Sequence, residues 1–285
     1  MTMIEALLLG IIQGLSEFIP ISSTAHLTIA ASLLGVIDPN HPERWTAFMA
    51  VVQLGTLGAV IMYFRREIRS MVMAFLHENV IRRTAFSRQS ADARMAWLVL
   101  LGSVPIVVIG LLFKDAIEGA FTKDLRVIAT SLIGLAVVLW FVDRRASFAR
   151  TTATMSVRDA LLVGLAQAVA LVPGSSRSGT TMTAALALGF TRESAARFSF
   201  LLSIPAVLGA GVLEFLHELD HIKWAEGGME LAGATVAAAL SGYWSIAFLL
   251  DFLRKRTMTS FVLYRIAIGV LLAGLLALGA VSPLP

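Results

Sequence analysis

The chain has 285 residues, of which 57% are hydrophobic and 15% are charged, and its formal net charge is +4. Soluble domains carry about 25% charged residues, so this composition excludes a water-soluble globular protein. The chain has no cysteine, which excludes disulfides, thiolate metal sites and cysteine nucleophiles.

The first 35 residues contain two short apolar stretches on either side of a polar loop. Residues 2–15 and 24–35 flank Ser16–Ser23. Each stretch is about half a membrane long at ~1.5 Å per helical residue. This pattern predicts a re-entrant helix–loop–helix pair over about 2–35, whose broken backbone is buried in protein instead of lipid.

Three longer apolar segments follow, each long enough to cross the ~30 Å hydrocarbon core as a helix. They cover residues 45–64, 95–113 and 125–142. Between the first two lies an arginine-rich stretch, residues 65–92, in which apolar residues alternate with arginine. We expect this stretch to be an amphipathic segment on the cytoplasmic side.

The second half of the chain has the same plan. Short apolar stretches at 157–172 and 180–189 flank Gly174–Gly179, which predicts a second re-entrant pair over about 157–189. Three further candidate spans cover 198–216, 229–253 and 260–281. The sequence therefore predicts an all-α polytopic membrane protein, a single membrane domain over 1–285 with six transmembrane helices and two re-entrant pairs.

The basic residues lie in the segments between spans and orient the protein. They are Arg65, Arg66, Arg69, Arg82, Arg83, Arg88, Arg144, Arg145, Arg150, Arg254, Lys255 and Arg256. Cytoplasmic loops carry the excess of Lys and Arg, so we expect these segments inside the cell and both termini in the periplasm. The positive charge thus indicates topology, and we expect no nucleic acid partner.

The two halves align as a repeat, 1–142 with 156–281. Pro20-Ile-Ser-Ser23 matches Pro173-Gly-Ser-Ser176, and Leu34-Gly35 matches Leu188-Gly189. Each half has one re-entrant pair and three spans, and three is odd, so the second half is inverted in the membrane. Inverted repeats place their binding site near the midplane, where broken helices meet. The small residues from Ala232 to Gly242 would also permit the close helix contact of a homodimer.

The first loop carries Gln13, Glu17, Ser22, Ser23 and His26. Ionisable groups at membrane depth are costly, so we expect them to have a function. Residues 13 and 17 share a helix face, and a hydroxyl and an imidazole at 23 and 26 are the parts of an activated nucleophile. Alternatively, His26 is a capping or core histidine.

The second loop carries a phosphate-binding composition. Gly174 and Gly179 let the backbone approach a ligand, and the planar fork of Arg177 suits phosphate oxygens. Both loops lead into helix N-termini, which favour anions. The hydroxyls are Ser175, Ser176, Ser178, Thr180 and Thr181. For Ser175 and Ser178, ordinary helix capping is an equal alternative, and Glu17 and Arg177 could simply pair with one another.

An anion site at membrane depth fits a polyphosphate head on a lipid tail. A carboxylate beside that head would repel it unless a divalent cation lies between them. Glu17, with Gln13 as a neutral oxygen ligand, therefore predicts Mg²⁺ or Ca²⁺. Such a cation spreads the charge of a transferring phosphoryl group.

These motifs resemble those of the undecaprenyl-diphosphate phosphatase family, the bacitracin-resistance proteins of bacterial inner membranes. The resemblance rests on Gln13-x-x-x-Glu17, Pro20-x-Ser-Ser-Thr-x-His26 and Pro173-Gly-x-Ser-Arg-Ser-Gly-x-Thr181, and extends to Phe198-Ser-Phe-Leu-Leu and Tyr264-Arg265. It implies hydrolysis of undecaprenyl diphosphate to the monophosphate carrier of peptidoglycan synthesis, divalent-cation dependence and bacitracin resistance. Two positions depart from the pattern. Position 13 is Gln where many members have Glu, and Arg197 stands where some carry an acid, so we give Arg197 no role.

The predicted mechanism has Arg177, Ser176, Thr181 and the loop amides hold the diphosphate while Ser23 attacks with His26 as base. His26 or water as the nucleophile are open alternatives. A flippase that moves the prenyl phosphate carrier is the rival function, since inverted repeats with broken helices are common in transporters. Neither the leaflet to which the site opens nor the preferred prenyl length follows from the sequence.

Overall fold

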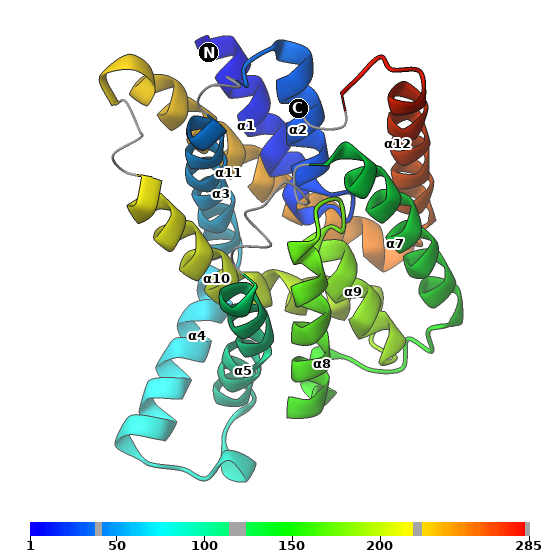
Figure 1. Ribbon diagram of the computed structural model, residues 1–285. Helices are drawn as coiled ribbons and strands as arrows, with labels where there is room; N and C mark the ends of the chain where they lie inside the picture. Colours follow the sequence, from blue (N-terminus) through cyan, green and yellow to red (C-terminus); the bar gives the residue numbers. More distant parts are fainter. Residues whose placement is uncertain (38–41, 114–123, 219–223, 283–285) are drawn as a thin grey trace.

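The computed structural model describes residues 1–37, 42–113, 124–218 and 224–282 (Figure 1). In these ranges all regular elements are helices, and the only β pairing is a single bridge between Arg150 and Phe190. The all-α prediction is therefore confirmed for the described part of the chain.

The first half contains α1 to α7. The main helices are α1 (Met3–Phe18), α2 (Ser23–Leu34), α3 (Pro42–Tyr63), α4 (Arg65–Phe75), α5 (Ala91–Leu112) and α7 (Leu125–Arg145). The second half contains α8 (Val157–Ala168), α9 (Arg177–Ala187), α10 (Arg192–Glu218), α11 (Trp224–Lys255) and α12 (Thr259–Ala277).

Five helices of the described chain are long and apolar enough to cross a membrane. They are Arg44–Tyr63, Ala91–Leu112, Leu125–Arg145, Gly227–Lys255 and Thr259–Ala277. Each coincides with an expected span. The sixth expected span, 198–216, lies in α10, and the side chains near its end fall outside the described residues.

The four helices of the expected re-entrant pairs are too short to cross. α1 has 16 residues, α2 and α8 have 12 each, and α9 has 11. At ~1.5 Å per residue, none reaches the ~30 Å of the hydrocarbon core. α1 and α8 begin with capping boxes, Thr2 with Glu5 and Ser156 with Asp159, which satisfy the free amides of the first turn. Figure 1 shows α1 and α2 in the upper half of the molecule and α8 and α9 in the lower half.

The short helices pack against long helices from the other half of the chain. α1 lies on α11, and α8 lies on α5. A Cβ on Gly10 would lie 2.2 Å from the carbonyl oxygen of Ala234, and one on Gly164 would lie 1.8 Å from that of Gly102. These crossings therefore require glycine. The small residues of α11 thus serve contacts within this chain, and Ala234 and Ala238 are fully buried.

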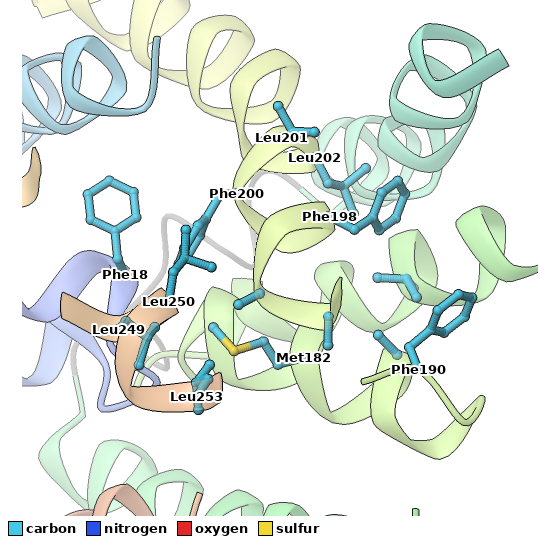
Figure 2. Close-up of a cluster of buried hydrophobic side chains, with 14 of the residues drawn as sticks. Phe18, Met182, Phe190, Phe198, Phe200, Leu201, Leu202, Leu249, Leu250 and Leu253 are labelled. Atoms are coloured by element: carbon cyan, nitrogen blue, oxygen red, sulfur yellow. The ribbon is translucent and has the colours of Figure 1, made fainter. Parts of the chain in front are cut away.

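The largest apolar cluster lies around α9 and α10. Its members labelled in Figure 2 are Phe18, Met182, Phe190, Phe198, Phe200, Leu201, Leu202, Leu249, Leu250 and Leu253. Phe190 lies between α9 and α10, and the others come from α1, α9, α10 and α11, so this cluster joins elements of both halves. The ring of Phe18 packs edge-on against that of Phe200, with centroids 5.3 Å apart.

The arginine-rich stretch 65–92 is a helical arm. α4 continues into a π-helix over Leu76–Ile81, and α5 begins at Ala91, earlier than expected. Figure 1 shows α4 and the start of α5 extending away from the other helices. Asn79 stabilises the end of the arm, because its Oδ1 accepts from Gln89 Nε2 at 2.8 Å and from Trp97 Nε1 at 3.0 Å.

Substituting Gly164→Ala should destabilise the protein, because the new methyl group would collide with the Gly102 carbonyl. We expect a loss of about 1–3 kcal/mol in the free energy of unfolding, measured as a lower melting temperature in detergent. Gly110→Ala is the matched control on α5, since a Cβ there meets nothing within 4 Å. Equal melting temperatures of the two variants would contradict the close crossing of α5 and α8.

Candidate active site

Both loops lead into their second helix through the same unusual cap. Ser22 has φ 77° and ψ 97°, and Ser176 has φ 68° and ψ 109°. Positive φ is uncommon outside glycine. The Ser22 hydroxyl accepts from the Ala25 amide at 3.5 Å, and the Ser176 hydroxyl accepts from the Gly179 amide at 3.2 Å. The two helix N-termini therefore have the same capping geometry, as the aligned Pro-x-Ser-Ser motifs predict.

Glu17 is the centre of the polar contacts between the loops. Its side chain is 4% exposed. One carboxylate oxygen, Oε2, accepts from Gln13 Nε2 at 2.9 Å and from the Ser23 hydroxyl at 2.6 Å. The other, Oε1, accepts from Arg177 Nη2 at 2.7 Å. One carboxylate thus joins α1, the first loop and α9.

Arg177 lies at the start of α9, 160 residues from Glu17 in sequence. Its side chain is 15% exposed, and Nη1 also reaches the Ser203 carbonyl of α10 at 3.5 Å. Desolvating two charges is costly, so a buried ion pair is weak support for stability by itself. The pair brings a guanidinium and a carboxylate into one cavity, as the sequence predicts, although it also matches the alternative of simple pairing.

His26 does not meet Ser23. Its Nδ1 lies 2.7 Å from the Ser22 carbonyl oxygen, and its Nε2 lies 2.7 Å from the Tyr264 hydroxyl. A carbonyl only accepts, so Nδ1 carries the proton and Nε2 accepts from Tyr264 in the neutral ring. The expected Ser23–His26 contact is therefore replaced by a Ser23–Glu17 contact, and His26 is held by a residue of α12.

The hydroxyls of the second loop divide into two groups. Ser176 lines the cavity, whereas Ser178 donates to the Ile19 carbonyl at 3.3 Å and so ties the two loops together. Thr181 donates to the Arg177 carbonyl at 2.7 Å and lies 2.6 Å from the Ser199 hydroxyl. Ser178 and Thr181, which we expected to bind substrate, therefore hold the loop in shape. The Ser175 hydroxyl is buried and has no partner among the described residues.

The two expected glycines differ in role. Gly174 lines the cavity, with φ 82°, and a Cβ there would lie 2.6 Å from the Ile128 carbonyl oxygen. A Cβ on Gly179 would lie 2.8 Å from Nη1 of Arg265. Gly179 therefore makes room for another side chain instead of for a ligand.

A cavity of about 170 Å³ lies between the loops. Its polar lining contains Glu17, Ser22, Ser23, Thr24, Ser176 and Arg177. The side chain of Gln53 on α3 also lines it, and nothing in the local sequence around Gln53 marks it as part of a site. The remaining lining, apart from Gly174, is apolar and comes from α5, α10 and residues 170–172.

Arg265 of α12 contacts both loops and is 1% exposed. Its guanidinium donates only to carbonyl oxygens, those of Pro20, Ser131, Leu132, Gly174 and Ser175, at 3.1 to 3.4 Å. No carboxylate of the described chain pairs with it. The motifs in the sequence assign Arg265 no role, although a lone arginine inside a 19-residue apolar helix is a usable signal of one.

The oxygen donors in the cavity fit a cation that a substrate helps to hold. Across the described ranges, no three His, Cys, Asp or Glu side chains gather into a metal cluster. Glu17 is the one carboxylate in the cavity lining, with Ser23 and the Gln13 amide beside it. Mg²⁺ is commonly bound by one or two carboxylates together with substrate phosphates, so this set suits an ion that arrives with a diphosphate.

Comparisons with known proteins agree on one family. A family described as "Bacitracin resistance protein BacA" matches residues 6–271. An undecaprenyl-diphosphatase from Syntrophobacter fumaroxidans is 52% identical over 94% of this chain and 95% of its own length. One from Myxococcus xanthus is 50% identical over 100% and 92%, and one from Chlorobium phaeovibrioides is 48% identical over 99% and 100%.

Substituting Arg265→Lys should weaken the junction of the loops, because an ammonium cannot reach carbonyls of both loops and α7 at once. We expect a loss of more than about 3 kcal/mol in the free energy of unfolding, since bonds to a charged donor contribute ~1.5–3 kcal/mol each. Thermal unfolding in detergent measures it. Arg126→Lys, at a side chain that is 67% exposed, is the control. If both variants melted at the wild-type temperature, Arg265 would not hold the loops.

Proposed function

This chain belongs to the bacitracin resistance protein BacA family, and from that premise we infer that the cavity between its two loops hydrolyses a lipid diphosphate. The chain is a multi-pass membrane phosphatase that converts undecaprenyl diphosphate to undecaprenyl phosphate and inorganic phosphate. The observation that carries the site assignment is the meeting of Glu17, Ser23 and Arg177 in one cavity. The product is the lipid carrier that cell-wall synthesis uses again.

We propose an inverted repeat, 1–142 and 156–281, with six spans and two re-entrant pairs. The contacts between the halves support it. In the repeat, α8 corresponds to α1 and α5 corresponds to α11, and α1 packs on α11 just as α8 packs on α5. The matching caps at Ser22 and Ser176 support it as well. Figure 1 shows the start of α1 and the end of α12 on the same side of the molecule, which fits two periplasmic termini in a bacterial inner membrane.

The diphosphate would lie between the N-termini of α2 and α9. Both ends offer unpaired backbone amides and the positive end of a helix dipole. Ser22, Ser23 and Thr24 come from one end, and Ser176 and Arg177 from the other. On binding, the guanidinium of Arg177 would exchange the Glu17 carboxylate for phosphate oxygens, to which its planar fork is suited.

Glu17 and Gln13 would hold a divalent cation, Mg²⁺ or Ca²⁺. The Gln13 amide now directs its nitrogen at Glu17, and rotation of the amide would present its oxygen. When bound, the ion neutralises negative charge on the phosphoryl group being transferred.

The chemical step uses the Ser23 hydroxyl as nucleophile. Its proton already points at Glu17 Oε2, 2.6 Å away, so Glu17 is the base instead of His26. As the bond from Ser23 to the terminal phosphorus forms, the bridging P–O bond breaks and lipid monophosphate leaves. Water then attacks the phosphoserine, which releases inorganic phosphate and restores the hydroxyl.

His26 acts as a positioning residue in this arrangement. Its ring fixes the Ser22 carbonyl at the start of α2 and is itself fixed by Tyr264, against which it stacks with centroids 5.5 Å apart. Direct attack by His26 would first require Nε2 to leave Tyr264. Trapping of phosphate on Ser23, on His26 or on neither separates the serine, histidine and water mechanisms.

Substituting Glu17→Ala, His26→Ala or Arg177→Ala should lower phosphate release from a prenyl diphosphate by at least about 100-fold, since each removes a group that positions or stabilises charge in the transition state. Glu193→Ala is the control, because its carboxylate pairs with Arg254 outside the cavity. Near-normal turnover by Arg177→Ala would remove the second loop from the proposed site.

Chelation should stop phosphate release by the detergent-solubilised protein, and Mg²⁺ or Ca²⁺ should restore it, because Arg177 alone cannot neutralise a diphosphate that the Glu17 carboxylate repels. Solubilised protein has no second compartment, so phosphate release there also separates hydrolysis from flipping of the prenyl carrier. Full activity in excess chelator would show that Arg177 and the backbone amides suffice to neutralise the diphosphate without a metal ion. No release under any condition, with carrier movement in vesicles, would favour the flippase.

A further inference from the structure

The cavity has an apolar wall that the proposed chemistry does not use. It consists of Ile106 on α5, Ala170, Leu171 and Val172 at the end of the α8 segment, and Ala206 and Val207 on α10. None of these side chains can bind a phosphate or a cation. The apolar residues 170–172 are separated by only one residue, Pro173, from Gly174 of the second loop, and none of the apolar wall comes from the first loop.

Two helix-interior prolines adjoin this wall in sequence. Pro105 precedes Ile106 in α5, and Pro205 precedes Ala206 in α10. A proline within a helix removes one backbone hydrogen bond and bends the helix away from its ring. α5 and α10 pack against each other. Each proline therefore lies next to a residue of the apolar wall.

Residues that follow the wall in sequence lie on the outer surface of the bundle. Val107 and Val108 on α5 are 47% and 46% exposed, and Leu208 on α10 is 48% exposed. In a membrane these side chains face lipid tails. The apolar wall and these exposed residues thus share α5 and α10, and none of them is charged.

We propose that the first isoprene units of the lipid lie against this wall, and that the wall fixes the direction of the diphosphate. The lipid-linked phosphate then lies at the N-terminus of α9, with Ser176 and Arg177. The terminal phosphate lies at the N-terminus of α2, beside the Ser23 hydroxyl. This inference rests on the proposed function and adds the orientation of its substrate.

The orientation agrees with the proposed step. The attacking group must lie next to the terminal phosphorus, and Ser23 belongs to α2, which contributes nothing to the apolar wall. Arg177 instead reaches the Ser203 carbonyl on α10, about one turn before Ala206 of the wall. The leaving group is the lipid monophosphate, and Arg177 would stabilise its developing charge. A cavity of about 170 Å³ is too small for a long prenyl chain, so the rest of the chain extends into the membrane.

The first experiment uses the unaltered protein and a farnesyl diphosphate with a diazirine on its first isoprene unit. We expect cross-links at Ile106, within 170–172 or at 206–207, lost when excess farnesyl monophosphate competes. Cross-links confined to α1, α2 or Gln53 of α3 would overturn the proposal. Phosphate release from unmodified prenyl diphosphate is measured in the same preparation, and its absence would instead refute the proposed function.

The second experiment compares the two matched caps, Ser22→Ala and Ser176→Ala, which remove the same hydroxyl at the same backbone conformation. The monophosphate product retains the lipid-linked phosphate. Binding of farnesyl monophosphate, measured by calorimetry, should be weakened at least fivefold more by Ser176→Ala than by Ser22→Ala. Equal weakening, or the reverse order, would overturn the orientation. Melting temperatures of both variants show that each is folded.

Discussion

A buried cation that only carbonyl groups satisfy joins the two polar loops. Arg265 reaches the backbone of both loops and of α7 from α12, and any side chain at Gly179 would displace it. Because the C=O of one residue and the N–H of the next point in opposite directions across a trans peptide, the bond from Arg265 to the Ser175 carbonyl turns the Ser176 amide the other way. That amide then points away from the Arg265 guanidinium. One guanidinium thus helps to fix the backbone at the start of α9.

Lipid solvation imposes the second constraint. Broken helices are tolerated at membrane depth only where protein or a cavity satisfies the free backbone groups. Here the ends of four short helices meet between long ones, and the glycines at 10 and 164 let the short helices approach their neighbours closely. The loops can therefore be buried only if α1 and α8 pack closely against their neighbours. The serine caps then satisfy one amide at each helix start and leave others free for a ligand.

Much of this architecture could be predicted from the chain, because apolar length and the positions of glycine, proline and arginine act locally. The short helices, the polar loops and the meeting of Glu17 with Arg177 belong to that part. The hydrogen-bond partners could not be predicted. Ser23 and His26 are three residues apart, yet one faces Glu17 and the other faces Tyr264, since the cap at Ser22 turns the start of α2. Side-chain direction at a strained cap depends on elements more than 200 residues away, which spacing alone cannot specify.

The ion pair between Glu17 and Arg177 has a consequence for turnover. Any anion that enters must compete with a carboxylate already 2.7 Å from the guanidinium. A group carrying two linked phosphates competes better than a group carrying one, because it brings more charge to the same donor. Under the proposed function, the Glu17 carboxylate would return to Arg177 after cleavage and displace the lipid monophosphate. Product escape would then follow from the resting contact itself.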